Sequence, residues 1–129
     1  MEKQPKILLI DDDMDFVNAT KTVLESRNYQ VSIAQNGDDG IQKARKEKPD
    51  LIILDIIMPV KDGFTAAEQL KKDTELSQIP VLILTSFSAR KGETTLAVSR
   101  GMDLETEDYI EKPVKPEELL KALERLLER

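Results

Sequence analysis

Short aliphatic runs alternate along the chain with segments whose apolar residues recur every three or four positions. Five runs predict strands: KILLI (6–10), YQVSIA (29–34), LIILD (51–55), IPVLILT (79–85) and DYIEK (108–112). Runs this apolar are typical of a parallel sheet that helices cover on both faces.

Amphipathic segments follow each predicted strand. The first predicted helix, 15–27, gathers small and apolar residues at helical spacing: Phe16, Ala19, Thr20, Val23 and Leu24. A second helix is predicted to run through about Lys46 with Asp38 or Asp39 as its N-cap, and further helices are predicted at 64–73, at 89–100, and from Pro116 onward. The last helix carries a leucine stripe formed by Leu119, Leu120, Leu123, Leu126 and Leu127.

This order repeats strand and helix five times, which predicts an α/β fold with right-handed crossovers. The 129 residues suit one domain, and no linker or repeat divides them. We therefore expect a single domain over 1–129 with no output domain. In such sheets ligands bind where the carboxyl ends of the strands meet.

The composition restricts the metals and partners that the chain could bind. The chain has no cysteine and no histidine, so a bound metal would need oxygen ligands, which favours Mg²⁺ or Ca²⁺. A net charge of −6 argues against direct nucleic-acid binding. No apolar run is long enough to span a bilayer, and the first residues, MEKQPK, lack the apolar core of a signal peptide. We expect a cytoplasmic protein without membrane insertion.

Polar residues that suit phosphoryl transfer stand at the carboxyl ends of four predicted strands. They are Asp11 and Asp12, Asp55, Thr85 and Ser86, and Lys112. If these strand ends are neighbours, carboxylates can hold Mg²⁺ beside a hydroxyl and an ammonium. One carboxylate can then attack a phosphoryl group in line while the cations neutralise its oxygens.

With these residues in these positions, the chain resembles a response-regulator receiver domain of two-component signalling over essentially its whole length. The resemblance rests on an ordered set of stretches: ILLIDDD (7–13), NGDDG (36–40), PDLIILDIIMPVKDG (49–63), IPVLILTS (79–86) and DYIEKPVKPEEL (108–119). It implies a flavodoxin-like, doubly wound (βα)5 domain with a parallel five-stranded sheet in the order 2-1-3-4-5.

The resemblance also implies roles for the acidic residues. Asp55 would be the phosphoacceptor. Asp12 and Asp55 would ligate Mg²⁺ directly, the backbone carbonyl of Ile57 would be a third ligand, and Asp11 would act mainly through a bound water.

For the remaining site residues, the resemblance implies phosphoryl binding and switching. Thr85, with Ser86 beside it, and Lys112 would hold phosphoryl oxygens, and Tyr109 would turn inward when Thr85 moves. The Lys112–Pro113 bond is expected to be cis and to aim the lysine.

The implied partners are a sensor histidine kinase or a histidine phosphotransfer protein, together with a downstream effector that the sequence does not identify. Because the chain has no histidine, the phosphohistidine donor must come from outside it. Beyond self-phosphorylation from a donor and autodephosphorylation, we expect no enzymatic activity.

Several alternatives compete with this interpretation. Asp12, Asp13 or Asp15 could simply cap a helix, and we expect Asp13 and Asp15 to cap or face solvent. An EF-hand starting at Asp11 fails, because Phe16 stands at the glycine position and Thr22 at the glutamate position. DMDFV (13–17) resembles the nucleophile motif of haloacid-dehalogenase-type phosphatases, which however places its nucleophile directly at the strand end. A phosphorylation-independent pseudo-receiver would keep the fold and lose a key residue, and none is lost.

Two features depart from the family pattern. Ile57 and Phe87 are apolar, and the resemblance implies that these positions help govern how water approaches an aspartyl phosphate, so we expect slow hydrolysis. A time course of phosphate release tests this: Phe87→Glu or Ile57→Asn should release phosphate faster, and unchanged rates would contradict it.

The acidic segment 102–108 is longer than receivers usually carry and borders the signalling face. A solvated loop is its simplest interpretation.

Overall fold

The computed structural model describes residues 4–55, 63–85, 108–111 and 115–127. Within these ranges the strands are β1 (Lys6–Ile10), β2 (Gln30–Ala34), β3 (Leu51–Asp55), β4 (Val81–Thr85) and β5 (Asp108–Glu111). The helices are α1 (Met14–Ser26), α2 (Gly37–Glu47), α3 (Gly63–Lys72) and α5 (Pro116–Leu127). None of the described helices is long and apolar enough to cross a bilayer.

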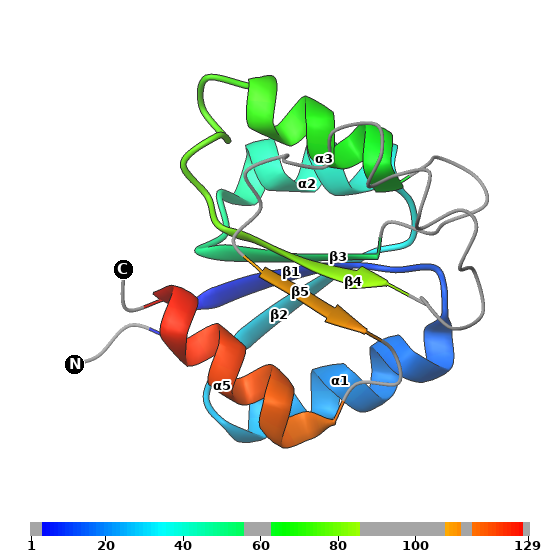
Figure 1. Cartoon of the computed structure of the whole chain (residues 1–129), viewed down its shortest axis with the longest axis vertical. Coiled ribbons are helices and arrows are strands. Elements are labelled where there is room, and N and C mark those ends of the chain that lie inside the picture. Colours follow the sequence, from blue (N-terminus) through cyan, green and yellow to red (C-terminus); the bar gives the residue numbers. More distant parts are fainter. Residues whose placement is uncertain (1–3, 56–62, 86–107, 112–114, 128–129) are drawn as a thin grey trace.

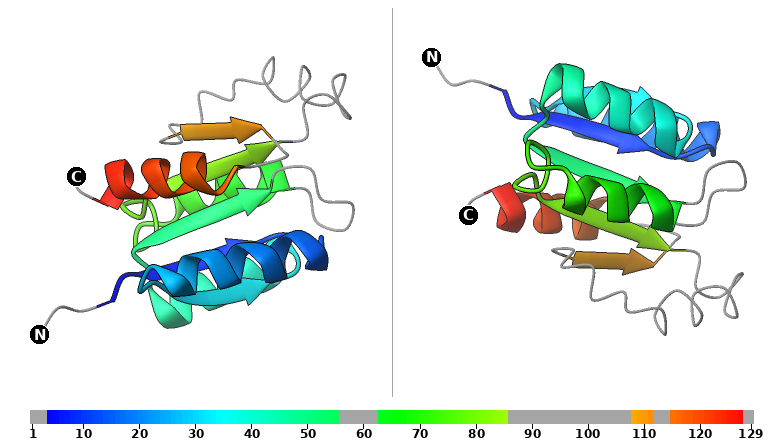
Figure 2. Two further views of the ribbon diagram at one scale, coloured as in Figure 1. Left: turned by 90° about the horizontal axis from the view of Figure 1, so that it is seen from below. Right: turned by 90° about the horizontal axis from the view of Figure 1, so that it is seen from above.

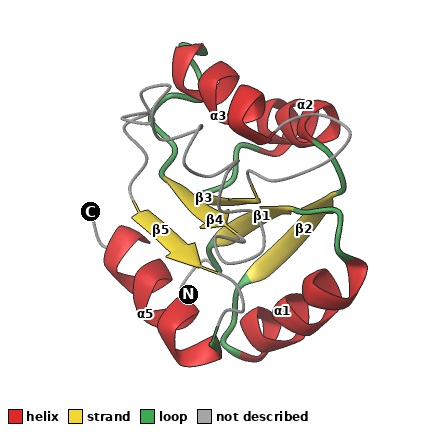
Figure 3. Cartoon of the chain, turned by 45° about the vertical axis from the view of Figure 1, so that its right-hand side comes forward, coloured by secondary structure: helices red, strands yellow, loops and turns green. Residues whose placement is uncertain are grey.

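All strand pairs are parallel, and the sheet has the order β2-β1-β3-β4-β5. Helices α2 and α3 cover one face, and α1 and α5 cover the other (Figure 1). Figure 2 shows the two helical layers from below and from above, and Figure 3 shows the sheet between them. The predicted α/β fold with strand order 2-1-3-4 is confirmed, and β5 continues it beside β4. The helix predicted at 89–100 lies outside the described residues.

The alternation of side chains in the central strands divides the core into two layers. In β1, Leu8 and Ile10 belong to the layer under α2 and α3, whereas Ile7 and Leu9 belong to the layer under α1 and α5. Strands β3 and β4 divide their buried residues in the same way. Each buried aliphatic side chain contributes roughly 1.5–3 kcal/mol relative to exposure. The ends of the central strands are therefore firmly held.

Strand β2 is more exposed to solvent than its predicted place in a covered sheet implied. Only Ala34 of this edge strand is buried, and its other residues are partly or fully exposed. Polar side chains of α2 reach over it: the Lys43 ammonium donates to the Ile33 carbonyl, and Ser32 Oγ donates to a Glu47 carboxylate oxygen. Strand β2 is at the edge of the sheet and pairs with β1 on one side, which is why its residues are less buried than those of the central strands.

The two helix starts confirm one expected cap and correct another. Asp13 caps α1, its Oδ1 accepting from the Phe16 amide at 3.2 Å. Asn36, and not Asp38 or Asp39, caps α2, because the helix begins at Gly37, two or three residues earlier than a cap at either aspartate predicts, and Asn36 Oδ1 accepts from the Asp39 amide at 2.9 Å. The two aspartates lie in the first turn, where negative charge is favourable.

The inner face of α1 is rotated slightly from the prediction. Val17, Thr20 and Leu24 are its buried residues, whereas Ala19 is exposed. Phe16 and Val23 pack at the margin of the core. In α5 the predicted leucine stripe is confirmed, with four leucines buried and Leu127 partly buried.

Candidate functional site

Two buried carboxylates lie side by side because the strands that carry them are in register. Ile10 of β1 pairs with Leu54 of β3, so Asp11 and Asp55 are the next residues along both strands. Asp11 is 0% exposed and Asp55 is 3% exposed. The Asp11 amide donates to the Ala34 carbonyl at 3.0 Å, which extends the hydrogen bonding to β2 by one residue. The backbone thus fixes both residues at the carboxyl edge of the sheet.

Asp12 completes an acidic cluster with these two residues. One carboxylate oxygen from each of Asp11, Asp12 and Asp55 lies within 4.8 Å of the other two. Asp12 is exposed, so the cluster is open to solvent on its side. Asp13 has a different role: its side chain caps α1, and its amide donates to Asp11 Oδ1 at 3.0 Å. The aspartate run is therefore divided between a binding cluster and a helix start.

The donor set of the cluster fits Mg²⁺. Hard carboxylate oxygens are the ligands this ion prefers, and octahedral Mg–O distances of about 2.0–2.1 Å put opposite ligands about 4.2 Å apart. Oxygens within 4.8 Å of one another can meet one ion after small side-chain movements, or with one carboxylate acting through water. Three carboxylates this close repel one another, and a bound divalent cation reduces that repulsion.

The register brings Thr85 to the same edge of the sheet. Asp55 pairs with Leu84, so Thr85 follows one residue later on the neighbouring strand, where it pairs with Glu111. Tyr109 pairs with Ile83, two residues earlier on the same two strands. The backbone therefore places Thr85 at the end of β4, next to the end of β3.

Other predicted site residues lie outside the described ranges: Ile57, Ser86, Phe87 and Lys112 with Pro113, as do residues 102–107 of the acidic segment 102–108. Their roles remain predictions. The structure thus joins three of the predicted residues, Asp11, Asp12 and Asp55, in one cluster, and Thr85 shares their edge of the sheet.

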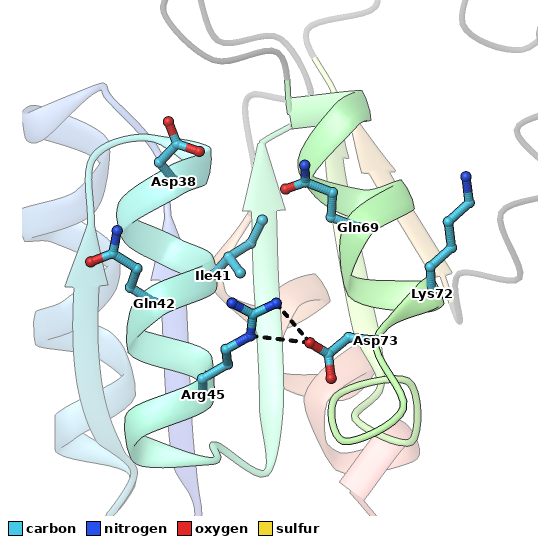
Figure 4. Close-up of a pocket in the computed structure, with 7 residues that line it drawn as sticks. All are labelled: Asp38, Ile41, Gln42, Arg45, Gln69, Lys72 and Asp73. Atoms are coloured by element: carbon cyan, nitrogen blue, oxygen red, sulfur yellow. Dashed lines mark hydrogen bonds and ion pairs between the residues drawn. The ribbon is translucent and has the colours of Figure 1, made fainter.

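A separate groove of about 550 Å³ lies between α2 and α3, and sequence reasoning did not predict it. Figure 4 shows the seven residues that line it: Asp38, Ile41, Gln42, Arg45, Gln69, Lys72 and Asp73. None of the three clustered aspartates lines this groove. It forms because residues far apart in sequence meet across two helices, for which the sequence carried no periodic signal.

Asp73 joins the two helices at one end of this groove. Its Oδ2 accepts from Arg45 Nε at 3.1 Å and from Arg45 Nη2 at 2.9 Å, as Figure 4 shows. Its Oδ1 accepts from the amides of Glu75 and Leu76 just after α3. The hydrogen bonds from Arg45, and then that from the Glu75 amide, hold the pKa of Asp73 below its usual value.

Replacing Asp73 should therefore destabilise the fold in a pH-dependent way. A pKa that is lower in the folded state contributes stability above the unfolded pKa, and this contribution disappears as pH falls through the folded pKa. We expect Asp73→Asn to lower the free energy of unfolding at neutral pH, with a difference from wild type that shrinks at acidic pH, below the ordinary carboxyl pKa of 3.8. Urea denaturation at both pH values measures this. Glu75→Gln, which changes an exposed neighbouring carboxylate, is the control, and a pH-independent deficit in Asp73→Asn would contradict the assignment.

Comparison with known proteins extends these observations to the whole chain. The family model described as "Response regulator receiver domain" matches residues 7–124. Protein PilH of Pseudomonas aeruginosa is 42% identical over 122 residues, which cover 95% of this chain and 97% of PilH. Transcriptional regulatory protein ResD of Bacillus subtilis is 36% identical and matches 98% of this chain. The chain spans about half the length of ResD and of several other curated regulators that it matches.

Solved structures of receiver domains and response regulators also match nearly the whole chain. The receiver domain of a sensor histidine kinase from Pseudomonas aeruginosa has a TM-score of 0.85 and 26% identity, and the match covers 98% of this chain and 100% of that one. That structure holds a magnesium ion coordinated in the active site cleft. Chemotaxis response regulator CheY4 of Vibrio cholerae has a TM-score of 0.82 and 28% identity, with 96% and 99% of the two chains covered.

Proposed function

Since the chain belongs to the response regulator receiver domains of two-component systems, we propose that it is a phosphoacceptor switch whose phosphoryl group is carried by Asp55. The observation that supports this most directly is the acidic cluster: Asp55 is buried at the end of β3, with a carboxylate oxygen within 4.8 Å of those of Asp11 and Asp12. A nucleophilic carboxylate beside a site suited to Mg²⁺ is the arrangement that phosphoryl transfer requires.

The proposed reaction moves one phosphoryl group from a phosphohistidine to Asp55. A carboxylate oxygen of Asp55 attacks the phosphorus of a phosphohistidine, a new O–P bond forms, and the N–P bond of the donor breaks. The donor imidazole leaves and takes up a proton. Asp12 and Asp55 would hold Mg²⁺ directly, with Asp11 acting through a water and the Ile57 carbonyl as a further ligand. When bound, the ion neutralises charge on the phosphoryl oxygens.

The proposed switch follows from the new charge on Asp55. Thr85, Ser86 and Lys112 are proposed to bind the phosphoryl oxygens, and Tyr109 to occupy the space that Thr85 leaves. The strand register supports the proposed binding of phosphoryl oxygens by Thr85, because Thr85 follows Leu84, the residue paired with Asp55. Phosphorylation then acts by shifting the population between two conformations, to the extent that it interacts differently with each.

The proposed partners are a sensor histidine kinase or a histidine phosphotransfer protein as donor, and an effector that recognises the phosphorylated conformation. The chain contains no histidine, so a phosphohistidine donor has to be a separate group. The relatives support this class of partner, since they include receiver domains of histidine kinases. A net charge of −6 does not favour a direct contact with nucleic acid.

Incubation with acetyl phosphate and Mg²⁺ tests the proposal. We expect intact mass spectrometry to detect one added phosphoryl group, and we expect EDTA to prevent its appearance. A chain that binds Mg²⁺ and yet is never labelled, by acetyl phosphate or by a cognate kinase, would contradict the proposal and indicate an interaction module that does not use phosphorylation.

A further inference from the structure

The backbone of α2 lies directly on the side chain of Ile10. Gly40 is buried on the inner side of α2, in the first full turn, where its amide donates to the Asn36 carbonyl at 2.9 Å. A β-carbon added at Gly40 would lie 2.4 Å from Ile10 Cδ1, 2.8 Å from Cγ1 and 3.2 Å from Cγ2. Non-bonded carbon atoms normally approach to about 3.5–4.0 Å. Any residue larger than glycine at this position must therefore displace Ile10 or the helix.

Ile10 has little room in which to move. Its side chain is 0% exposed and belongs to the same core cluster as Ile41 and Ala44 of α2. On the sheet it is paired with Ala34 on one side and with Leu54 on the other. Rotation about χ2 can move Cδ1, but Cγ1 at 2.8 Å moves only with χ1, at which a β-branched side chain is stiff. A push on Ile10 is therefore passed to the backbone of β1.

That part of the backbone carries the acidic cluster. Ile10 directly precedes Asp11, and its partner Leu54 directly precedes Asp55. Ile10 and Leu54 are thus the last paired residues before the two buried carboxylates. A displacement of Ile10 would change the position of Asp11 relative to Asp55, on which the spacing of the cluster depends.

We propose that Gly40 is a positioning residue for the acidic cluster: because it has no β-carbon, α2 can rest on Ile10 and hold Asp11 level with Asp55. The proposal rests on the proposed function of the cluster as a Mg²⁺ site. The requirement for glycine is specific to position 40, because Ala44, one turn later on the same inner face, is fully buried with its methyl group. Helix propensity alone predicts that Gly40→Ala stabilises α2. The steric contact with Ile10 predicts the opposite, a destabilising effect.

The test compares the Mg²⁺ affinity of wild type, Gly40→Ala, Ile10→Val and the double variant by isothermal titration calorimetry. We expect Gly40→Ala to bind Mg²⁺ about ten-fold more weakly, as for other residues that orient metal ligands. Ile10→Val alone is the reference for the double variant. The double variant should recover part of the loss, because valine removes Cδ1, the atom at 2.4 Å, and keeps Cγ1. Gln42→Ala, an exposed change on the same helix, should leave the affinity unchanged.

Thermal unfolding in EDTA separates positioning from a purely structural role. A Gly40→Ala variant that unfolds at lower temperature but binds Mg²⁺ like wild type would overturn the proposal, as would a double variant with no recovery. Should Gly40→Ala alone not fold, the double variant compared with Ile10→Val gives the same test, and weaker binding by the double variant is then expected. Failure of wild type to bind Mg²⁺ would instead refute the function proposed for the cluster, so the two failures are distinguishable.

Discussion

Asp55→Asn is expected to abolish labelling by acetyl phosphate or by a cognate kinase. The amide that replaces the carboxylate has nearly the same shape, so the fold should persist, but it is neutral and a poor nucleophile towards phosphorus. It also removes one of the three negative charges that would hold the cation. Intact mass spectrometry after incubation with the donor and Mg²⁺ measures the stoichiometry.

The matched control for this variant is Asp15→Asn. Asp15 is exposed in the first turn of α1 and is not a member of the acidic cluster, so the substitution makes the same chemical change away from the site. We expect it to be labelled like wild type. Circular dichroism should show that both variants fold. Labelling of Asp55→Asn at the wild-type stoichiometry would place the phosphoacceptor elsewhere.

Asp12→Ala is expected to weaken Mg²⁺ binding more than ten-fold. Asp12 contributes the exposed carboxylate of the cluster, and its removal leaves Asp11 and Asp55 as the only members. Mg²⁺ sites of this kind depend on one or two direct carboxylates, so the loss of one removes a large share of the attraction. Calorimetric titration measures the affinity, and labelling at low Mg²⁺ concentration should fall in parallel.

Asp13→Ala is the control that separates binding from folding. Asp13 is the next residue, but its side chain caps α1 and is not a member of the cluster. Loss of such a cap costs about 1 kcal/mol of stability. We therefore expect Asp13→Ala to unfold more easily and yet bind Mg²⁺ like wild type. Equal losses of affinity in the two variants would show that Asp12 acts through the start of the helix and is not a ligand.

The acidic cluster was predictable because a parallel sheet aligns the ends of its strands. The aliphatic runs before Asp11 and before Asp55 are of the same kind, and each ends in aspartate. Once both strands are central and parallel, their carboxyl ends meet at one edge of the sheet. Burial of the runs, their boundaries and the proximity of the carboxylates all follow from this single pattern.

Details that depend on competition between neighbours were not predictable. Asn36, Asp38 and Asp39 can all cap a helix, and only the observed start at Gly37 selects Asn36. The contact of Gly40 with Ile10 depends on how closely α2 approaches the sheet, and no local signal reports this distance. The link between Arg45 and Asp73 likewise joins residues 28 positions apart.

The uneven burial of the three carboxylates affects how quickly an ion can exchange. Asp12 faces solvent while Asp11 and Asp55 lie beneath it, so an arriving cation meets a hydrated carboxylate before it reaches the other two. None of the helices in the described part of the chain has to open for this approach. Because Mg²⁺ gives up its water shell reluctantly, the speed of loading should depend on dehydration of the ion and not on motion of the protein.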